Sequence, residues 1–432
     1  MESRKASSNN RSGLRMIFRA LRSRNYRLYF GGQGISLIGT WMQATAMSWL
    51  VYRLTDSAFL LGAVAFISQI PAVVFGPLAG VLADRWDRRR ILLMTQILAM
   101  IQAFALAALI LTGAIAVWHI VALSLMLGLI NSIDVPARQS FVVEMVESKS
   151  DLGNAIALNS LLFNGARIAG PSIAGIVIAK WNEGVCFTLN GISYLAVLAA
   201  LLMMTVQPRK ARQGDAHILQ EMKEGFTYAF DFKPIRYLLL LIGLVSTLVM
   251  PYAVLMPVFA KSILHGGASA QGFLMASAGV GALTGAMFLA SRHSVLGLGR
   301  VIAMSSSLLG AGLILFSFSR VLALSSLFLV LTGSGMMVTM ASCNTLLQTI
   351  VEDDKRGRVM SLYTMAFFGA APVGSLLAGI LASRIGAPYT VMICGVCCLL
   401  SSLVIVKQLP TMRKIVRPIY VTMNIIPEAK DG

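Results

Sequence analysis

Long apolar stretches separated by short polar loops fill most of this 432-residue chain. Each stretch is near or above the roughly 20 residues that a helix needs to cross the hydrocarbon core of a bilayer. The pattern predicts an all-α integral membrane protein with twelve transmembrane helices. The stretches cover residues 28–52, 58–83, 91–112, 115–143, 154–179, 184–206, 237–260, 268–291, 300–319, 321–349, 359–383 and 387–408.

The twelve stretches form two similar sets of six, with a repeat offset of about 204 residues. Gly76-Pro77-Leu78-Ala79-Gly80 returns as Gly281-Ala282-Leu283-Thr284-Gly285, and Gly165, Gly170 and Gly175 return as Gly369, Gly374 and Gly379. Because one offset holds throughout, the halves run parallel, related by an axis along the membrane normal. Such repeats are typical of secondary transporters, in which two halves open a central site to alternate sides.

Polar segments flank and join the two halves. We predict a cytoplasmic basic tail (1–27), an N-terminal six-helix half (28–206), a cytoplasmic linker (207–236), a C-terminal six-helix half (237–408) and a cytoplasmic tail (409–432). The linker's apolar residues recur every three or four positions, which favours a helix lying along the inner membrane surface.

Composition and charge agree with a membrane protein. Hydrophobic residues make up 57% of the chain and charged residues 12%, and the mean hydropathy is +0.76. The net charge of +18 does not indicate nucleic-acid binding, because the basic residues lie at the ends of apolar helices. If the N-terminus is inside, the outer loops contain few basic residues, namely Arg53, Lys180, Lys261, Arg320 and Arg384.

The positive-inside rule therefore predicts that both termini are cytoplasmic. We expect a multi-pass protein of the bacterial plasma (inner) membrane that acts as a monomer. Its expected partners are the lipid bilayer and a small-molecule substrate, with no nucleic acid.

Residues that would indicate an enzyme or a metal site are scattered. All five cysteines fall in predicted spans, Cys394, Cys397 and Cys398 lack clustered His or carboxylate companions, and the four histidines lie far apart. No Gly-rich phosphate loop occurs. The sequence predicts no catalytic residue, no metal and no enzyme activity, and no cofactor other than a proton gradient.

A charge cluster follows the second predicted helix, where residues 80–90 read Gly-Val-Leu-Ala-Asp-Arg-Trp-Asp-Arg-Arg-Arg. Gly76 and Gly80 would let another helix approach closely just before the acidic residue. The segment resembles the Gly-x-Leu-x-Asp-Arg-x-Gly-Arg-Arg signature of the major facilitator superfamily, with Asp87 in place of a glycine. The resemblance implies a cytoplasmic latch in which Asp84 meets the N-terminal end of helix eleven; a solvated turn is the alternative. The latch residues would be Gly80, Asp84, Arg85, Arg88 and Arg89.

Glycines and a proline are regularly spaced in the fifth predicted helix. Ala166, Gly170 and Ala174 recur at spacing four, which allows close helix packing, and Pro171 favours a kink; packing alone is one explanation. The stretch also resembles the Gly-x4-Gly-Pro-x3-Gly signature of exporters in the superfamily, which implies efflux. The residues concerned are Gly165, Gly170, Pro171 and Gly175.

Few ionisable residues lie deep in the predicted spans. Asp134 and Arg138 are one turn apart on the fourth helix, and Arg167 lies near the middle of the fifth. A charge at this depth costs at least about 2.5 kcal/mol, so it needs a partner. We expect Arg167 to pair with Asp134 or with an anionic substrate group; a static ion pair that joins the two helices is the alternative. Asp134 is the candidate for proton coupling.

Three segments resemble one branch of the superfamily, that of the enterobactin exporter and macrolide efflux proteins. The segments are Ser23-Arg24-Asn25-Tyr26-Arg27-Leu28-Tyr29-Phe30, Pro136-Ala137-Arg138-Gln139 and Asp151-Leu152-Gly153-Asn154-Ala155.

Amide side chains of the first half could line a polar cavity or tie helices together, whereas the second half is rich in methionine, which favours an adaptable apolar wall. The amides are Gln33, Gln43, Gln69, Gln96, Gln102 and Asn131.

These features together predict a secondary active transporter. The hypothesis is a proton-coupled exporter (antiporter) that moves an amphipathic small molecule, such as a siderophore or drug, by alternating access. The alternatives are an uptake symporter or lipid flippase of the same fold, or a sensor that does not transport.

Overall fold

A computed structural model describes residues 19–146, 148–205, 226–292, 294–352, 355–423 and 425–426. Every secondary-structure element in these ranges is a helix, so the predicted all-α class is confirmed. Most of the basic tail and the linker stretch 206–225 lie outside the described residues.

The chain divides into two compact units. The N-terminal unit comprises residues 1–54 and 67–213, and the C-terminal unit comprises residues 55–66 and 214–432. Helices assigned to the N-terminal unit are η1 (Arg19–Arg22), α2 (Arg24–Thr55), α3 (Ala58–Arg85), α4 (Arg88–Leu111), α5 (Val117–Met145), η2 (Lys149–Asp151), α6 (Leu152–Lys180) and α7 (Glu183–Met203). The first residues of α3 group with the C-terminal unit.

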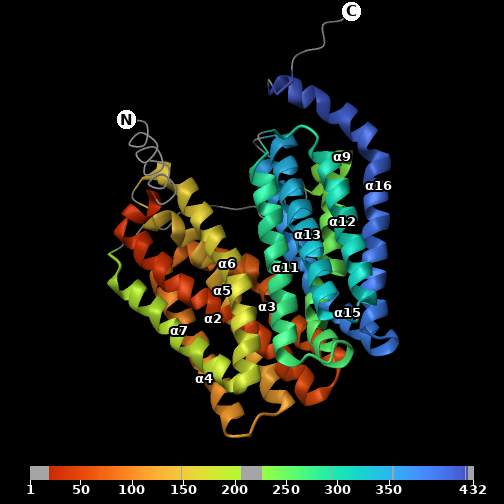
Figure 1. The fold of residues 1–432 in the computed structure, drawn as a ribbon. Coiled ribbons are helices and arrows are strands. Elements are labelled where there is room, and N and C mark those ends of the chain that lie inside the picture. The colour runs from red at the N-terminus through yellow and green to blue at the C-terminus, as the bar shows by residue number, and fades with distance from the viewer. Residues whose placement is uncertain are drawn as a thin grey trace, which may run out of the picture. The chain divides into compact units, whose positions relative to one another are not determined.

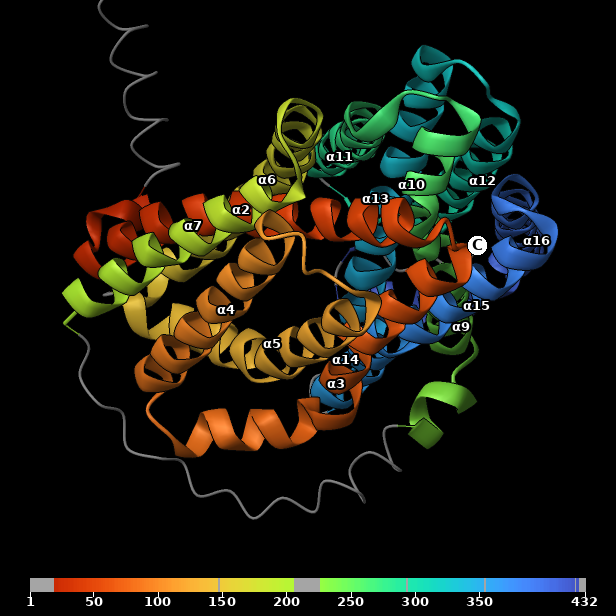
Figure 2. The same cartoon turned by 90° about the horizontal axis from the view of Figure 1, so that it is seen from below.

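Glycines bring the helices of the N-terminal unit together. A Cβ on Gly32 of α2 would lie 2.8 Å from the carbonyl oxygen of Ala196 on α7, and one on Gly170 of α6 would lie 2.5 Å from the Cβ of Trp41. On another side of the unit, α4 packs against α5 and α7 (Figure 2). These contacts place the middle sections of α2, α4, α5 and α7 around one interior.

The C-terminal unit contains the remaining helices. They are α9 (Lys233–Leu244), η3 (Val245–Val249), η4 (Met250–Leu255), α10 (Met256–Val258), η5 (Phe259–Ile263), α11 (Gly267–Ala290), α12 (Leu298–Phe318), α13 (Leu322–Ile350), α14 (Arg356–Thr364), η6 (Met365–Gly369), α15 (Ala370–Ile385) and α16 (Ala387–Thr422). The helix α13 packs against α11 and α12, and α12 also packs against α16 (Figure 1). At Gly281 a Cβ would lie 2.0 Å from the carbonyl oxygen of Val330, so α11 and α13 touch backbone to backbone.

Two predicted spans of the C-terminal unit are interrupted. The stretch 237–260 is divided among α9, η3, η4, α10 and η5, and the stretch 359–383 is divided among α14, η6 and α15. Both η3 and η6 are π-helices, and prolines at positions 251, 257 and 372 follow the breaks. A proline removes one helical hydrogen bond, which explains why regular helix does not continue there.

Eleven helices in the described ranges are long and apolar enough to cross a membrane. The predicted stretch 28–52 forms α2, which has 32 residues but is not among those eleven. Buried glutamines, serines and threonines of α2 lower its hydropathy, and they supply contacts described below. At the other end of the chain α16 continues to Thr422, beyond the predicted end at residue 408.

Candidate functional site in the N-terminal unit

A buried ion pair lies on α5. Asp134 is 1% exposed and pairs with Arg138, which is one helical turn further on and 26% exposed. From α4, the Thr95 hydroxyl donates to Asp134 Oδ1 at 2.7 Å and the Gln96 amide donates to the same oxygen at 2.8 Å. Three donors from two helices therefore hold this carboxylate in one orientation and compensate for its burial.

Two tyrosines lie beside this pair. Tyr29 of α2 and Tyr194 of α7 both interact electrostatically with Asp134 and Arg138. The Tyr29 hydroxyl is buried without a hydrogen-bond partner, whereas the Tyr194 side chain forms a hydrogen bond with Asn190. Sequence reasoning placed Tyr29 only in a branch motif and missed Tyr194, because nothing in a single chain shows which aromatic residues face a buried charge.

Amide side chains form a second polar layer. Gln43 of α2 donates to Gln102 of α4 at 3.0 Å and accepts from Asn190 of α7 at 2.7 Å. All three side chains are buried. Of the two roles left open for the predicted amides, Gln43 and Gln102 therefore tie helices together, and Gln96 positions Asp134.

Arg167 lies near the middle of the 29-residue α6 and is partly buried. The expected pairing with Asp134 is absent, because Arg138 occupies that carboxylate from the same helix. Among the described residues the Arg167 guanidinium has no ion pair. The static link between the fourth and fifth spans through these two residues is therefore not present in this structure.

Two of the predicted latch residues lie at the start of α4, and their described contacts are within the N-terminal unit. Arg88 pairs with Glu144 of α5 at 2.5 Å, and Arg89 donates to the carbonyl oxygens of Leu201 and Leu202 at the end of α7. The structure does not describe the surroundings of Gly80 or the side chains of Asp84 and Arg85. The proposed contact of Asp84 with helix eleven is therefore not described.

Asp87, which replaces the signature's glycine, caps α4. Its side chain accepts from the backbone N–H groups of Arg89 and Arg90. An Asp at this position satisfies two N–H groups that have no partner within the helix, and it suits the positive end of the helix dipole. The departure from the signature thus has a local structural role.

The glycine-proline motif of α6 has mixed surroundings. Gly170 contacts α2 through Trp41 as described above, and Pro171 and Gly175 are buried. No atom lies within 4 Å of a Cβ built on Gly165, nor on Gly76 of α3. The small residues at spacing four, Ala166, Gly170 and Ala174, are all buried, whereas the described residues place no neighbour at Gly165 or Gly76. Pro171 leaves α6 assigned as one helix.

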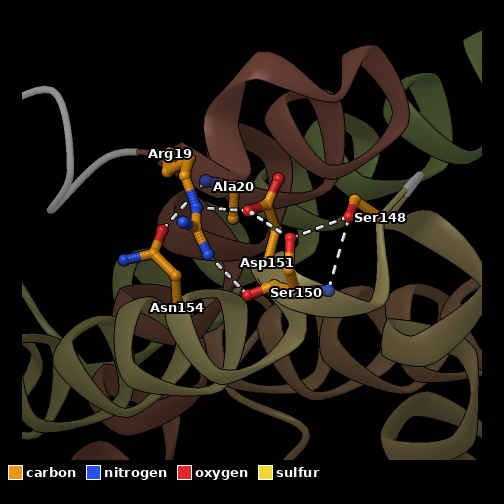
Figure 3. A network of polar contacts seen from close by, with 6 residues as sticks. All are labelled: Arg19, Ala20, Ser148, Ser150, Asp151 and Asn154. Atoms are coloured by element: carbon orange, nitrogen blue, oxygen red, sulfur yellow. Dashed lines mark hydrogen bonds and ion pairs between the residues drawn. The ribbon is translucent and has the colours of Figure 1, made fainter.

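The branch motif at the entry to α6 holds η1 in place (Figure 3). Arg19 pairs with Asp151 and donates to the Ser150 carbonyl oxygen at 2.5 Å. The Ala20 N–H donates to Asn154 Oδ1 at 2.9 Å. These polar contacts explain why charged and amide residues occur just before a long apolar helix.

A cavity of about 220 Å³ lies in the C-terminal unit, at the ends of α12 and α15 and the start of α16. None of the site residues predicted from the sequence lines it. It is bordered by Ser317, Phe318, Arg320, Ile385, Gly386, Pro388, Tyr389 and Met392.

The helical fold with its long apolar helices is that of major facilitator superfamily transporters. The nucleoside transporter NupG, of known crystal structure, has the same fold, with a TM-score of 0.67 over 90% of this chain and 99% of that chain at 14% identity. More specifically, residues 17–419 match the family described as transmembrane secretion effector, and the chain belongs to that family. The predicted resemblance is confirmed.

Two curated relatives are transporters of bacteria. The chain is 24% identical to the staphyloferrin A transporter of Staphylococcus aureus, over 86% of this chain and 92% of the relative. It is 23% identical to macrolide efflux protein A of Streptococcus pyogenes, over 86% of this chain and 93% of the relative. The protein is therefore a multi-pass membrane transporter and not an enzyme.

Proposed function

We propose that this protein is a proton-coupled exporter of an amphipathic small molecule, working by alternating access in the bacterial plasma membrane with both termini in the cytoplasm. The observation that carries the proposal is the Asp134–Arg138 pair, which is buried in the middle of apolar helices and contacted by α4. Ionisable groups at membrane depth mark ion and substrate pathways.

The proposed coupling step uses the two partners differently. When Asp134 takes up a proton, it no longer needs Arg138 as a counter-ion, and the more exposed guanidinium is released. Loss of the proton restores the pair. Export as the direction is supported by the Gly170-Pro171 motif and by the efflux function in the name of one relative.

The test is transport in everted membrane vesicles, with and without an imposed proton gradient, using fluorescent amphipathic compounds and a catecholate siderophore. Gradient-dependent accumulation inside the vesicles is the expected result. No movement of any compound by correctly folded protein would contradict export and would favour uptake, lipid transport or sensing.

Asp134→Asn tests the coupling group. The substitution keeps the side-chain shape but removes the titratable carboxyl, so gradient-driven flux should be lost while the protein stays folded. Asp56→Asn, which changes an exposed carboxylate, is the matched control and should transport normally. Normal gradient-driven flux in Asp134→Asn would exclude Asp134 as the coupling group.

A further inference from the structure

One cation within the apolar helices of the N-terminal unit, Arg167, has no counter-ion among the described residues. Asp134, Arg138 and Arg167 are the ionised side chains that lie away from the helix ends in its described helices. Asp134 and Arg138 neutralise each other. Arg167 therefore leaves one uncompensated positive charge, and a guanidinium stays protonated in proteins.

No described carboxylate of this unit is free to pair with Arg167. Each of them already has a basic partner within 4 Å. The pairs are Asp87 with Arg90, Asp134 with Arg138, Glu144 with Arg88, Asp151 with Arg19, and Glu183 with Arg53. A counter-ion for Arg167 must therefore come from elsewhere.

Two polar residues precede Arg167 on its face of α6. Ser160, Asn164 and Arg167 are spaced by four and three residues, so they share one face of the helix. Ser160 is exposed, and the other two are only partly buried. Asn164 donates one amide hydrogen to the Ser160 carbonyl oxygen at 2.8 Å and retains a second hydrogen for another acceptor. An arginine at membrane depth faces water or a ligand, because contact of its charge with lipid would be costly.

We propose that the transported molecule carries a carboxylate, and that Arg167 binds this group with the Asn164 amide as a neutral second donor. The inference rests on the proposed transport function and adds the substrate class, an amphipathic organic anion. Arginine suits the role because its planar fork donates two parallel hydrogen bonds to one carboxylate. Binding supplies the missing counter-ion, so an anion is favoured over a neutral analogue of the same shape.

The experiment uses the full-length protein in detergent and two ligands that differ by one charge, a fluorescent aminocoumarin carboxylate and its methyl ester. Fluorescence anisotropy gives the Kd of each. Wild-type protein should bind the carboxylate more tightly than the ester. Arg167→Gln should weaken carboxylate binding by about tenfold to hundredfold, the value of a charge-assisted hydrogen bond, and leave ester binding unchanged.

Two further variants make the test specific. Arg167→Lys keeps the charge but loses the fork, so it should retain only part of the preference for the carboxylate. Arg384→Gln removes an exposed arginine at the end of α15 and should change neither Kd. If Arg167→Gln does not fold, as judged by gel filtration, the proposal is tested by comparing the affinities of wild-type protein and Arg167→Lys for the carboxylate and the ester.

Three results would overturn the proposal. They are equal affinity of the wild-type protein for the two ligands, no binding of the carboxylate, and an equal loss of affinity for both ligands in Arg167→Gln. Failure of the transport function is a separate result. If wild-type vesicles transport only neutral or cationic dyes, the result would support the export function and contradict the anionic substrate. Vesicles that move nothing would reject the exporter, while the binding assay would still report on Arg167.

Discussion

The two units have different interiors. Buried polar side chains of the N-terminal unit include two carboxylates and several amides, among them Asp134, Gln43 and Asn190. In the C-terminal unit the buried polar side chains of the described residues are hydroxyls, apart from Gln271. Its helices are instead interrupted by π-helical and 3₁₀ segments at η3, η4, η5 and η6.

This difference separates two requirements of a transporter. Charge chemistry needs side chains held in fixed geometry, which the uninterrupted α4 and α5 provide around Asp134. Changes of helix shape need backbone that is not fully regular, and π-segments are often found at functional positions. The two repeated halves therefore differ: the N-terminal unit contains the buried ion pair, and the C-terminal unit contains the interrupted helices.

Removing Asp134 should have the largest effect, because it breaks the polar interior of the N-terminal unit. Asp134→Ala leaves Arg138 without its partner, and we expect the free energy of unfolding to fall by about 3 kcal/mol, at the low end for such pairs because Arg138 is 26% exposed. Chemical denaturation in mixed micelles measures this change. The double variant with Arg138→Ala should recover part of the loss.

The C-terminal control is Ser342→Ala. The Ser342 hydroxyl is buried without a hydrogen-bond partner in the structure, so its removal should be neutral or stabilising. If Ser342→Ala costs as much as Asp134→Ala, the energetic contrast between the two interiors is not real.

Equivalent glycines of the repeat should give the next largest effect. A Cβ at Gly281 would clash with the Val330 carbonyl oxygen at 2.0 Å, whereas Gly76 has no neighbour within 4 Å. Gly281→Ala should therefore lower stability by about 1–3 kcal/mol through overpacking. Gly76→Ala should be neutral or slightly stabilising, because alanine is the better helix former. Equal effects in thermal denaturation would show that the two helices pack alike.

A smaller effect is expected where η3 and η6, two of the π-helices of the C-terminal unit, meet. The buried Ser246 hydroxyl of η3 donates to the Phe367 carbonyl oxygen of η6. Ser246→Ala should lower stability by about 1 kcal/mol and speed hydrogen exchange selectively in η3 and η6. Exchange that quickens uniformly across the unit, or not at all, would argue against a local link.

Much of this contrast could be predicted from the sequence, but its geometry could not. Apolar stretches located the spans, and scarcity of charge singled out Asp134, Arg138 and Arg167. Spacing also put Asp134 and Arg138 on one face, yet the choice between Arg138 and Arg167 as partner depends on how α5 and α6 are rotated. Rotation is set by packing of many apolar side chains, which a single chain does not display. The same limit explains why Gly76 and Gly281 occupy equivalent positions of the repeat but only Gly281 meets a neighbouring backbone.

The smallest effect should come from the exposed ion pair of the C-terminal unit. Asp56 pairs with Lys261 at 2.5 Å, but its side chain is 66% exposed. Asp56→Asn should lower stability by no more than about 1 kcal/mol, and added salt should abolish the difference. Asp56 also has a φ of 46°, which Asn tolerates and a β-branched residue does not. Asp56→Val should therefore cost more than Asp56→Asn, and the excess should persist in high salt because it reflects backbone strain rather than charge. If Asp56→Asn cost as much as Asp134→Ala in the same denaturation assay, burial would not be what separates these two ion pairs.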